Sequence, residues 1–380
     1  MFETFGLDQK FVDLLNKNEI TQPSAIQKLA IAPILQGQDA FLQSPTGSGK
    51  TLAYLLPALQ RIDPTARQLQ VLIVVPNQEL GMQIYREIEN YGQPNGVSGI
   101  SLIGSAALKR QIEKLRDKPQ IAVGTPGRIV ELLEAKKLTL HHVRSLILDE
   151  ADQLFQLGNG KELERLVKAT LRERQTVAVS ATLSEQSRSK LQAMMKPGSI
   201  QCAVDVQEHK AAVGGTTKHG FLLAEPRDQI DVLRKAIHAM KAQVALVFVG
   251  DANRIMEVSD KLKFNGLAAA PLYGEAGKQE RAAVIDGFRR GQVQYLVTTD
   301  VAARGLDFAD VTHVFMMDVP RQKEGYVHRA GRTGRMGKSG TVITIIAKHQ
   351  VADLKRIARH ADVQLEPWVL SQGRISLYKG

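Results

Sequence analysis

The sequence predicts an α/β protein with two domains, each a mostly parallel sheet flanked by helices. Three observations support this prediction. The chain has 380 residues, of which 43% are hydrophobic and 23% charged, enough for two ordinary globular domains. Short β-rich apolar runs alternate with helical stretches, as in sheets built from strand–helix–strand units. A segment of glycine and small residues divides these runs into two series.

The apolar runs are short, contain β-branched residues and end at turn or polar residues, which is typical of buried strands. The first series is "VLIVV" at 71, "QIAV" at 120, "SLIL" at 145 and "TVAV" at 176. The second is "VALVFV" at 244, "YLVTT" at 295, "HVFMMD" at 313 and "TVITII" at 341. Many runs end in a polar or glycine-containing cluster. Ligands of open α/β sheets bind outside the carboxyl ends of the strands, so these clusters are the candidate functional surface.

The domain boundaries follow from composition. We place the first domain at residues 1–206 and the second at 219–365. Residues 207–218, "QEHKAAVGGTTK", contain two glycines and no apolar periodicity, which favours a linker. A surface loop inside one large domain is the alternative. We expect residues 366–380 to form a short tail, with no third domain.

The charge predicts the kind of partner. The formal net charge is +11, and residues 211–380 carry 25 basic and 17 acidic side chains. This excess favours a polyanion such as nucleic acid. The single cysteine, Cys202, excludes an intramolecular disulfide and a cysteine-based zinc cluster. No apolar run approaches the roughly 20 residues of a membrane span, and the N-terminus lacks a secretory pattern, so we expect a cytoplasmic protein without membrane contact.

The segment "SPTGSGKT", residues 44–51, lies between the apolar "DAFLQ" and the helical "LAYLLPALQRI". A glycine-rich turn between a strand and a helix points backbone N–H groups at one spot, where the helix N-terminus also favours phosphate. Lys50 would reach the β- and γ-phosphates, and the Thr51 hydroxyl would bind Mg²⁺. The alternative is an ordinary glycine-rich turn.

Two adjacent carboxylates follow the run "LIL" at residues 146–148. A nucleotide site needs one carboxylate at a neighbouring strand end to hold Mg²⁺, the role we predict for Asp149. It needs a second to orient and deprotonate the attacking water, the role we predict for Glu150. An acidic helix N-terminus is the alternative and explains one or two carboxylates.

The segment "HRAGRTGR", residues 328–335, places basic side chains between glycines in the second domain. Arg332 and Arg335 would act as arginine fingers, a contribution of about 10³ to 10⁵ in rate. A basic RNA-binding loop is the alternative. If the fingers come from the second domain, hydrolysis requires the two domains to close.

Together with "TPGR", "SAT" and "TDVAARGLD", these motifs occur in an order and spacing that resemble a DEAD-box RNA helicase of superfamily 2. The likeness covers essentially the whole chain and points to a minimal bacterial-type member without a C-terminal accessory domain. It implies two tandem RecA-like domains and an RNA-dependent ATPase that uses ATP and Mg²⁺. The implied catalytic residues are Lys50, Asp149, Glu150, Arg332 and Arg335.

The resemblance also implies a nucleotide site. Gln27 would pair with the adenine edge, Asp307 would bind the ribose, and Phe2 would pack on the base unless it is a core or surface aromatic. Glu19 stands where the family usually has glycine. The implied cofactor-binding residues are Phe2, Gln27, Thr46, Gly47, Ser48, Gly49, Lys50, Thr51 and Asp307, with Thr51 and Asp149 on the metal.

The implied RNA path crosses both domains and contacts mainly phosphate and sugar, so binding should be largely independent of sequence. Its residues are Pro76, Gly104, Thr125, Gly127 and Arg128 in the first domain, and Thr299, Arg304 and Gly305 in the second. Interdomain coupling would involve Asp152, Ser180, Thr182 and His328; local hydrogen bonding is the alternative for the two hydroxyl residues. The chain departs from the family at Asn77, Gln78, Ser105, Tyr273 and Lys278, positions that affect RNA grip and domain coupling more than ATP chemistry.

The predicted function is an ATP-dependent RNA helicase or remodelling ATPase that locally separates short RNA duplexes. We expect a monomer that acts in ribosome assembly or RNA metabolism, with ribosomal RNA or pre-ribosomal particles among its partners. One alternative is a nucleotide-gated RNA clamp with weak unwinding. Another is a DNA-directed ATPase of the same superfamily.

Overall fold

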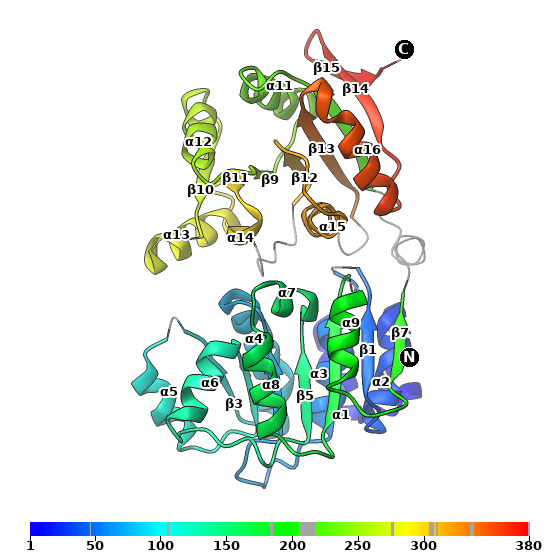
Figure 1. Ribbon diagram of the computed structural model, residues 1–380, viewed down its shortest axis with the longest axis vertical. Helices are drawn as coiled ribbons and strands as arrows, with labels where there is room; N and C mark the ends of the chain where they lie inside the picture. Colours follow the sequence, from blue (N-terminus) through cyan, green and yellow to red (C-terminus); the bar gives the residue numbers. More distant parts are fainter. Residues whose placement is uncertain are drawn as a thin grey trace. The chain divides into compact units, whose positions relative to one another are not determined.

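The computed structural model describes residues 1–45, 47–104, 106–182, 185–204, 217–274, 277–303, 308, 311–334 and 338–378. The chain divides into two compact units, Met1–His209 (unit 1) and Lys210–Gly380 (unit 2). Each unit contains one sheet of mostly parallel strands with helices packed on it (Figure 1). The predicted fold class is therefore confirmed.

Unit 1 has a seven-stranded sheet in the order β3-β4-β2-β5-β6-β1-β7. All neighbouring strands in it run parallel. The strands are β1 (Ala40–Gln43), β2 (Val71–Val74), β3 (Gly99–Leu102), β4 (Ile121–Gly124), β5 (Ser145–Leu148), β6 (Gln175–Ser180) and β7 (Ile200–Ala203).

The helices of unit 1 follow the strands and cover both faces of the sheet. They are η1 (Phe2–Phe5), α1 (Gln9–Lys17), α2 (Ala25–Leu35), α3 (Lys50–Gln60), α4 (Gln78–Gly92), η2 (Gln93–Asn95), α5 (Leu108–Leu115), α6 (Pro126–Glu134), α7 (Ala151–Gln156), α8 (Gly160–Ala169) and α9 (Glu185–Gln192).

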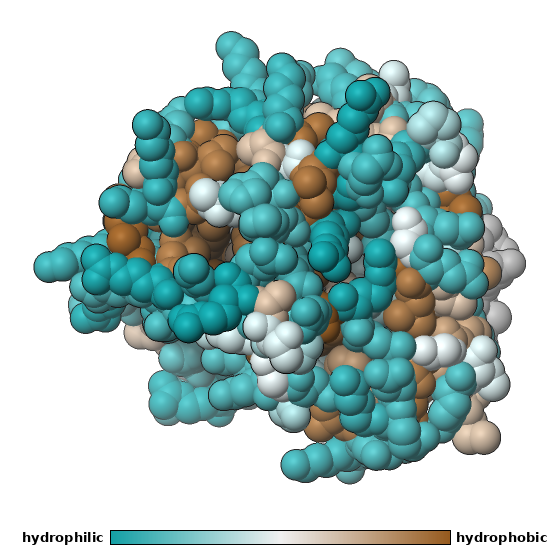
Figure 2. Space-filling model, turned by 90° about the horizontal axis from the view of Figure 1, so that it is seen from below, coloured by the Kyte–Doolittle hydropathy of each residue, from teal (hydrophilic) through white to brown (hydrophobic). Residues whose placement is uncertain are grey.

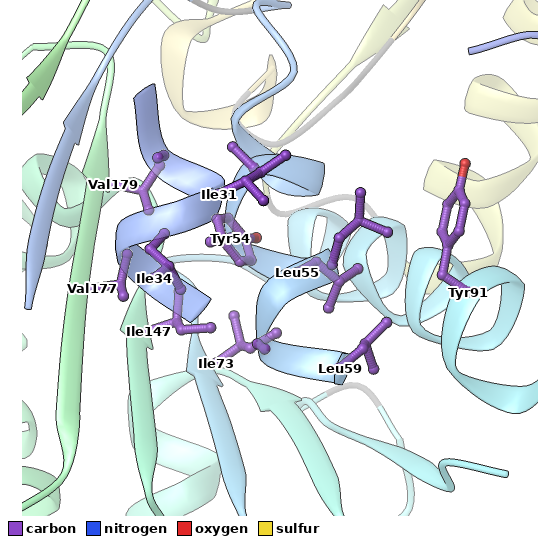
Figure 3. Close-up of a cluster of buried hydrophobic side chains, with 14 of the residues drawn as sticks. Ile31, Ile34, Tyr54, Leu55, Leu59, Ile73, Tyr91, Ile147, Val177 and Val179 are labelled. Atoms are coloured by element: carbon purple, nitrogen blue, oxygen red, sulfur yellow. The ribbon is translucent and has the colours of Figure 1, made fainter. Parts of the chain in front are cut away.

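Alternation along each strand sends side chains to two cores. On β2, Ile73 joins the core beneath α2 and α3, whereas Leu72 and Val74 join the core on the opposite face. Figure 3 shows the first core, where Tyr54 and Leu55 of α3 lie over strand residues such as Ile147. Because α3 packs by its apolar face on the centre of the sheet, its first turn is fixed at the ends of the strands.

Unit 2 has an eight-stranded sheet in the order β10-β11-β9-β12-β13-β8-β14-β15. Among the strands that the structure describes, only the β14–β15 pair is antiparallel. The strands are β8 (Thr217–Leu223), β9 (Ala245–Phe248), β10 (Ala269–Leu272), β11 (Tyr295–Thr298), β12 (His313–Met316), β13 (Gly340–Ile346), β14 (Glu366–Ser371) and β15 (Arg374–Leu377). The helices are α11 (Gln229–Met240), α12 (Arg254–Phe264), α13 (Lys278–Arg289), α14 (Asp300–Ala303), α15 (Lys323–Ala330), η3 (Lys348–Gln350) and α16 (Val351–His360).

All eight apolar runs singled out in the sequence form strands. The expected linker lies outside the described residues except for Thr217 and Lys218, which begin β8 instead. We expected residues 366–380 to form a short tail. Residues 366–377 instead form the hairpin β14–β15 at the sheet edge.

Trp368 anchors this hairpin. It is only 9% exposed, and its indole N–H donates to Glu366 Oε2 at 2.9 Å. The ring lies so close to Gly220 on β8 that a β-carbon at that glycine would be 2.2 Å from it. The hairpin is thus held by a contact between residues 148 positions apart in the printed sequence, which no local periodicity reveals.

Figure 2 shows one face of the molecule, on which hydrophilic side chains predominate and hydrophobic ones gather in separate patches. Within the described residues, no helix combines the length and the apolar content needed to cross a bilayer.

Candidate active site

The strand order of unit 1 sorts the predicted motifs along one edge of its sheet. The phosphate-loop, DEAD and SAT segments follow β1, β5 and β6, which are neighbours in the order β5-β6-β1. The RNA positions Pro76, Gly104 and Thr125 follow β2, β3 and β4, which are neighbours in the order β3-β4-β2. Because all seven strands are parallel, both sets lie at the carboxyl edge, in adjoining halves.

The phosphate loop leads directly into α3, which begins at Lys50. Gly49 has φ +87°, a conformation that strongly favours glycine. The Lys50 ammonium folds back over the loop and donates to the carbonyl oxygens of Ser44 and Pro45 at 2.6 Å each. A lysine held in this way lies beside the helix N-terminus, where phosphate is favoured.

The loop fits a phosphate ligand. The Ser44 and Ser48 side chains are buried, and their hydroxyl oxygens have no hydrogen-bond partner among the described residues. Gly47 also has a positive φ, +81°. Thr51 is the second residue of α3 and half-buried. Buried hydroxyls together with the backbone N–H groups of a helix start are the donor set that a triphosphate requires.

Gln27 connects the predicted adenine segment to the phosphate loop. Its Oε1 accepts from the Ser24 N–H at 2.9 Å, and its Nε2 donates to the Gly49 carbonyl at 3.1 Å. The side chain is 3% exposed. A primary amide has two N–H groups and two lone pairs, so one donor and one acceptor remain. These are the two groups that the adenine edge would need.

Phe2 is 1% exposed and belongs to the same core as Leu7 and Phe11. Nearly its whole surface is covered by unit 1 itself, which favours the core alternative. The packing of Phe2 on the base remains a prediction.

Asp149 is held by a tyrosine that the sequence analysis missed. Its Oδ2 accepts from the Tyr54 hydroxyl at 2.7 Å, and its Oδ1 accepts from the Glu150 N–H at 2.8 Å. Burial raises the pKa of Asp149, although the hydrogen bond from Tyr54 and the charge of Lys50 act in the opposite direction. Burial, and then the charge of Asp149, raise the pKa of Tyr54 well above its usual value. Tyr54 therefore remains a neutral donor that orients the carboxylate.

Glu150 has a backbone conformation that L-residues rarely adopt, with φ +47° and ψ +50°. It is the residue before α7 and marks a sharp turn between β5 and that helix. Such left-handed non-glycine residues cost about 1 to 3 kcal/mol and cluster at functional sites.

Asp152 joins the DEAD and SAT segments. Its Oδ1 accepts from the Ser180 hydroxyl at 2.5 Å, and its Oδ2 accepts from the Thr182 hydroxyl at 3.0 Å. Both Asp152 and Ser180 are buried. The structure thus brings these three predicted coupling residues together through local hydrogen bonds, while their role in coupling remains a prediction.

Arg128 lies at the predicted RNA edge of unit 1. Its guanidinium donates to the carbonyl oxygens of Ala106 and Gly104, both at 3.0 Å, and to Gln111 Oε1 at 2.7 Å. Its Nε lies 2.9 Å from Glu131. These bonds use guanidinium N–H groups that a phosphate would otherwise bind. Arg128 therefore positions the loop after β3, while its direct contact with RNA remains a prediction.

Asn77, one of the departures from the family pattern, has a structural role. Its Oδ1 accepts from the Leu80 N–H at 2.9 Å and caps the N-terminus of α4. The loop after β2 therefore ends in a helix cap at the position where the family places a hydroxyl residue.

In unit 2, Arg329 forms a buried ion cluster that the sequence analysis also missed. Its side chain is 3% exposed and donates to Asp300 at 2.6 and 2.7 Å and to Asp318 at 3.0 and 3.2 Å. The guanidinium lies 5.3 Å from the ring centroid of Phe248. Burial alone would lower the pKa of Arg329, but the two carboxylates raise it above its usual value. The cluster ties α15, which carries His328, to α14 and to the end of β12.

The remaining predicted positions divide into two groups. Arg332 is buried, His328 and Thr299 are half-buried, and Gly127 is exposed. The positions that fall outside the described residues are Thr46, Ser105, Arg304, Gly305, Asp307 and Arg335.

The donor set limits how a metal could be held. Among the described residues, no group of three or more His, Cys, Asp or Glu side chains could hold a metal ion. One buried carboxylate, Asp149, and the Thr51 hydroxyl instead fit Mg²⁺, which is usually bound by one or two carboxylates together with substrate phosphates.

Comparisons with known proteins agree with this site. The DEAD/DEAH box helicase family pattern matches residues 24–191, and the helicase conserved C-terminal domain matches residues 228–337. DEAD-box ATP-dependent RNA helicase CshC of Bacillus cereus is 42% identical over 335 residues, 88% of this chain and 84% of that protein. The probable ATP-dependent RNA helicase YfmL of Bacillus subtilis is 39% identical over 360 residues, 95% and 94% of the two chains.

Solved structures extend the likeness to the whole fold. S. cerevisiae Dbp5 bound to RNA and ADP BeF3 matches with a TM-score of 0.87 and 28% identity, over 96% of this chain and 95% of that chain. Mss116p bound to ssRNA and AMP-PNP matches with a TM-score of 0.83 and 25% identity, over 96% and 78%. The two sheets are thus RecA-like domains. The chain belongs to the DEAD-box family of ATP-dependent RNA helicases.

Proposed function

We propose that this helicase uses ATP and Mg²⁺ to separate short RNA duplexes locally. One observation carries the proposal: the carboxyl edge of the unit 1 sheet holds Lys50 and Asp149 in one half and the predicted RNA loops in the adjoining half. Strands β2 and β5 are neighbours and join the two halves. A ligand in either half therefore contacts the same rigid sheet edge.

The ATP chemistry would be divided among a few side chains. Lys50 would exchange its bonds to the loop carbonyls for phosphate oxygens, and Thr51 and Asp149 would hold the metal. Mg²⁺, when bound, would neutralise charge on those oxygens. Glu150 would orient the attacking water and accept its proton.

Unit 2 would supply positive charge to the transferring phosphoryl group through Arg332 and Arg335. Because these residues belong to a different unit from Lys50, hydrolysis would require both units to bind one nucleotide. ATP and RNA together would favour this arrangement, and hydrolysis would release it, so that ligand binding shifts the population between two states. Asp152, Ser180, Thr182 and His328 would couple the two units.

The proposed substrate is structured RNA of ribosomal origin, in ribosome assembly or RNA turnover, and the proposed active form is a monomer. The basic excess supports RNA contacts that are independent of base sequence. If about five phosphates are bound, the logarithm of affinity should fall against the logarithm of salt with a slope near −3.5.

A nucleotide-gated RNA clamp is the second candidate. It is favoured by the bonds that occupy the Arg128 guanidinium, because they reduce the positive charge offered at the predicted RNA edge. Such a protein would bind RNA in the presence of ATP and separate strands poorly. Catalytic separation of a short RNA duplex under ATP distinguishes the two functions.

The deciding experiment is steady-state ATP hydrolysis with Mg²⁺, without nucleic acid, with RNA and with DNA of the same sequence. The helicase proposal predicts strong stimulation by RNA alone, since only RNA offers the 2′-hydroxyl. Equal stimulation by DNA would contradict it. RNA binding without stimulation would favour the clamp.

A further inference from the structure

Unit 2 contains a cavity of about 1390 Å³ that none of the nucleotide, RNA or coupling residues lines. It lies between the hairpin β14–β15, α11, the start of α16 and the end of β8. Figure 1 shows the hairpin and α11 at the end of unit 2 opposite to α13, α14 and α15. The volume exceeds the roughly 300 to 1,000 Å³ of a small-molecule site, which favours a longer ligand.

The cavity opens where two strands part. Strand β13 pairs with β8 from Thr217 to Leu223, but β14 pairs with β8 only through Glu366 and Pro367. Beyond Pro367, β14 turns to pair with β15. Leu222 and Leu223 therefore have no described strand on the hairpin side, and Leu223 is 51% exposed. Although β8 is an internal strand of the sheet order, the gap beside these two residues is a short site where an added strand could pair.

The floor of the cavity is apolar. It includes Leu222 and Leu223 of β8, Val232 of α11 and Leu370 of β14. Beside them, Val369 is 37% exposed and Tyr378 is 60% exposed. Exposed apolar side chains gathered around one groove are typical of an interaction site.

The rim carries positive charge. Arg234, Lys235, His238, Lys348, His349 and Lys355 line the cavity, and no Asp or Glu among the described residues does. Asp231 pairs with both Arg234 and Lys235 at 2.7 Å and offsets part of their charge. Lys348 and Lys355 make no ion pair with a described residue, so their charge remains available to a ligand.

We propose that this groove binds an extended, acidic segment of a partner protein. The segment would pair with β8 at Leu222 and Leu223, where no described strand pairs on the hairpin side. Alternate side chains of an extended strand point in opposite directions, so apolar residues would enter the floor while acidic residues would face Lys348 and Lys355. The proposal concerns a protein ligand and is independent of the ATP and RNA sites.

RNA is the less suitable occupant. Base stacking needs exposed rings, but Trp368 is buried and its indole N–H is used by Glu366. Among the Phe, Tyr and Trp residues that line the cavity, only Tyr378 is largely exposed. An apolar floor beside an open strand edge matches a peptide backbone and its side chains better than a sugar–phosphate chain.

The test uses the full chain and a displayed library of random ten-residue peptides. Peptides are selected on the wild type, and their dissociation constants are measured by fluorescence polarisation. The key variant is Lys348→Glu/Lys355→Glu. The matched control, Lys261→Glu/Lys263→Glu on α12, changes the net charge equally at exposed lysines that pair with Glu257 and Asp260. Thermal unfolding confirms that both variants fold.

We expect the selected peptides to alternate apolar and acidic residues and to bind the key variant about tenfold more weakly, because two attractive charge pairs become repulsive. The control should bind them as the wild type does. Leu223→Ser should also weaken binding, since it removes an apolar contact without changing charge.

Three results would overturn the proposal. One is that selection enriches no peptide whose binding depends on Lys348 and Lys355. Another is that the enriched peptides lack acidic residues. The third is that the key variant loses RNA affinity by the same factor while peptide binding is unchanged, which would identify the groove as an RNA surface.

Discussion

The two units bury opposite charges at their functional segments. In unit 1 the buried groups are carboxylates, and neutral hydroxyls satisfy them: Tyr54 for Asp149, and Ser180 with Thr182 for Asp152. In unit 2 the Arg329 guanidinium is buried and pairs with two carboxylates. A neutral donor orients a carboxylate without cancelling its charge, whereas a carboxylate cancels the charge of a guanidinium. In unit 1 the carboxylates thus keep a negative charge that a ligand can use, whereas in unit 2 the ion pairs of Arg329 stabilise the fold.

The largest expected effect comes from Glu150→Gln, which removes the proposed base and preserves the size of the side chain. Turnover of ATP should fall by about 10² to 10⁴, the usual contribution of a general base. ATP and RNA affinities should remain near those of the wild type, as measured by equilibrium binding beside single-turnover hydrolysis. Near-normal turnover would show that the Glu150 carboxylate does not act as the base in hydrolysis.

Arg329→Gln tests whether the ion pairs of Arg329 stabilise the fold of unit 2. Breaking a fully buried ion pair costs about 3 to 5 kcal/mol. We expect about 2 to 3 kcal/mol, because the Asp300 side chain is 41% exposed and water screens part of the interaction. Urea unfolding measures the loss. Arg329→Lys is the matched control, since it keeps the charge but not the two-pronged geometry, and it should fall between the wild type and Arg329→Gln.

Tyr54→Phe removes one hydroxyl from the shell around Asp149. Groups that orient a metal ligand typically contribute about 10- to 100-fold in metal affinity, and we expect an effect near the lower value. The measurement is ADP binding as a function of Mg²⁺ concentration, with binding in EDTA as the control that should not change. If the Mg²⁺ dependence is unaltered, the hydroxyl contributes only to packing.

Arg128→Gln tests whether Arg128 holds the loop after β3 in place or binds RNA directly. RNA affinity should decrease because the loop after β3 loses its anchor. The slope of the logarithm of affinity against the logarithm of salt should nevertheless stay constant, because a lost phosphate contact would change it by about 0.7. A change of that size would restore Arg128 as a direct RNA ligand.

The smallest effect is a pH dependence in unit 2. Burial lowers the pKa of His313 below its usual value of about 6.5. The unfolded chain therefore binds a proton at this residue more readily than the folded chain does. Stability should fall as pH drops through about 6.5 and level off below the folded pKa. His313→Gln should reduce this slope in urea unfolding at pH 5 to 8, and an unchanged slope would assign it to other groups.

Prediction from sequence succeeded where the signal is local. Runs such as "SLIL" at 145 became strands whose four residues are all buried, and the glycine, lysine and carboxylate clusters follow the strands as expected. It failed where the signal is a contact between distant residues. Tyr54 and Asp149 are 95 positions apart, and neither residue type reveals the other. The bonds from Arg128 to the carbonyl oxygens of Ala106 and Gly104 are likewise contacts that no residue type encodes.

The hydrogen bond from Gln27 to the Gly49 carbonyl constrains how this chain can vary. A β-carbon at position 49 would lie 2.6 Å from Gln27 Nε2, and Gln27 is buried with both ends of its amide bonded. A larger residue at position 49 would therefore meet two obstacles, the contact with Gln27 and the positive φ of +87°. A shorter side chain at position 27 would remove only the first, so position 49 is expected to remain glycine even where position 27 changes.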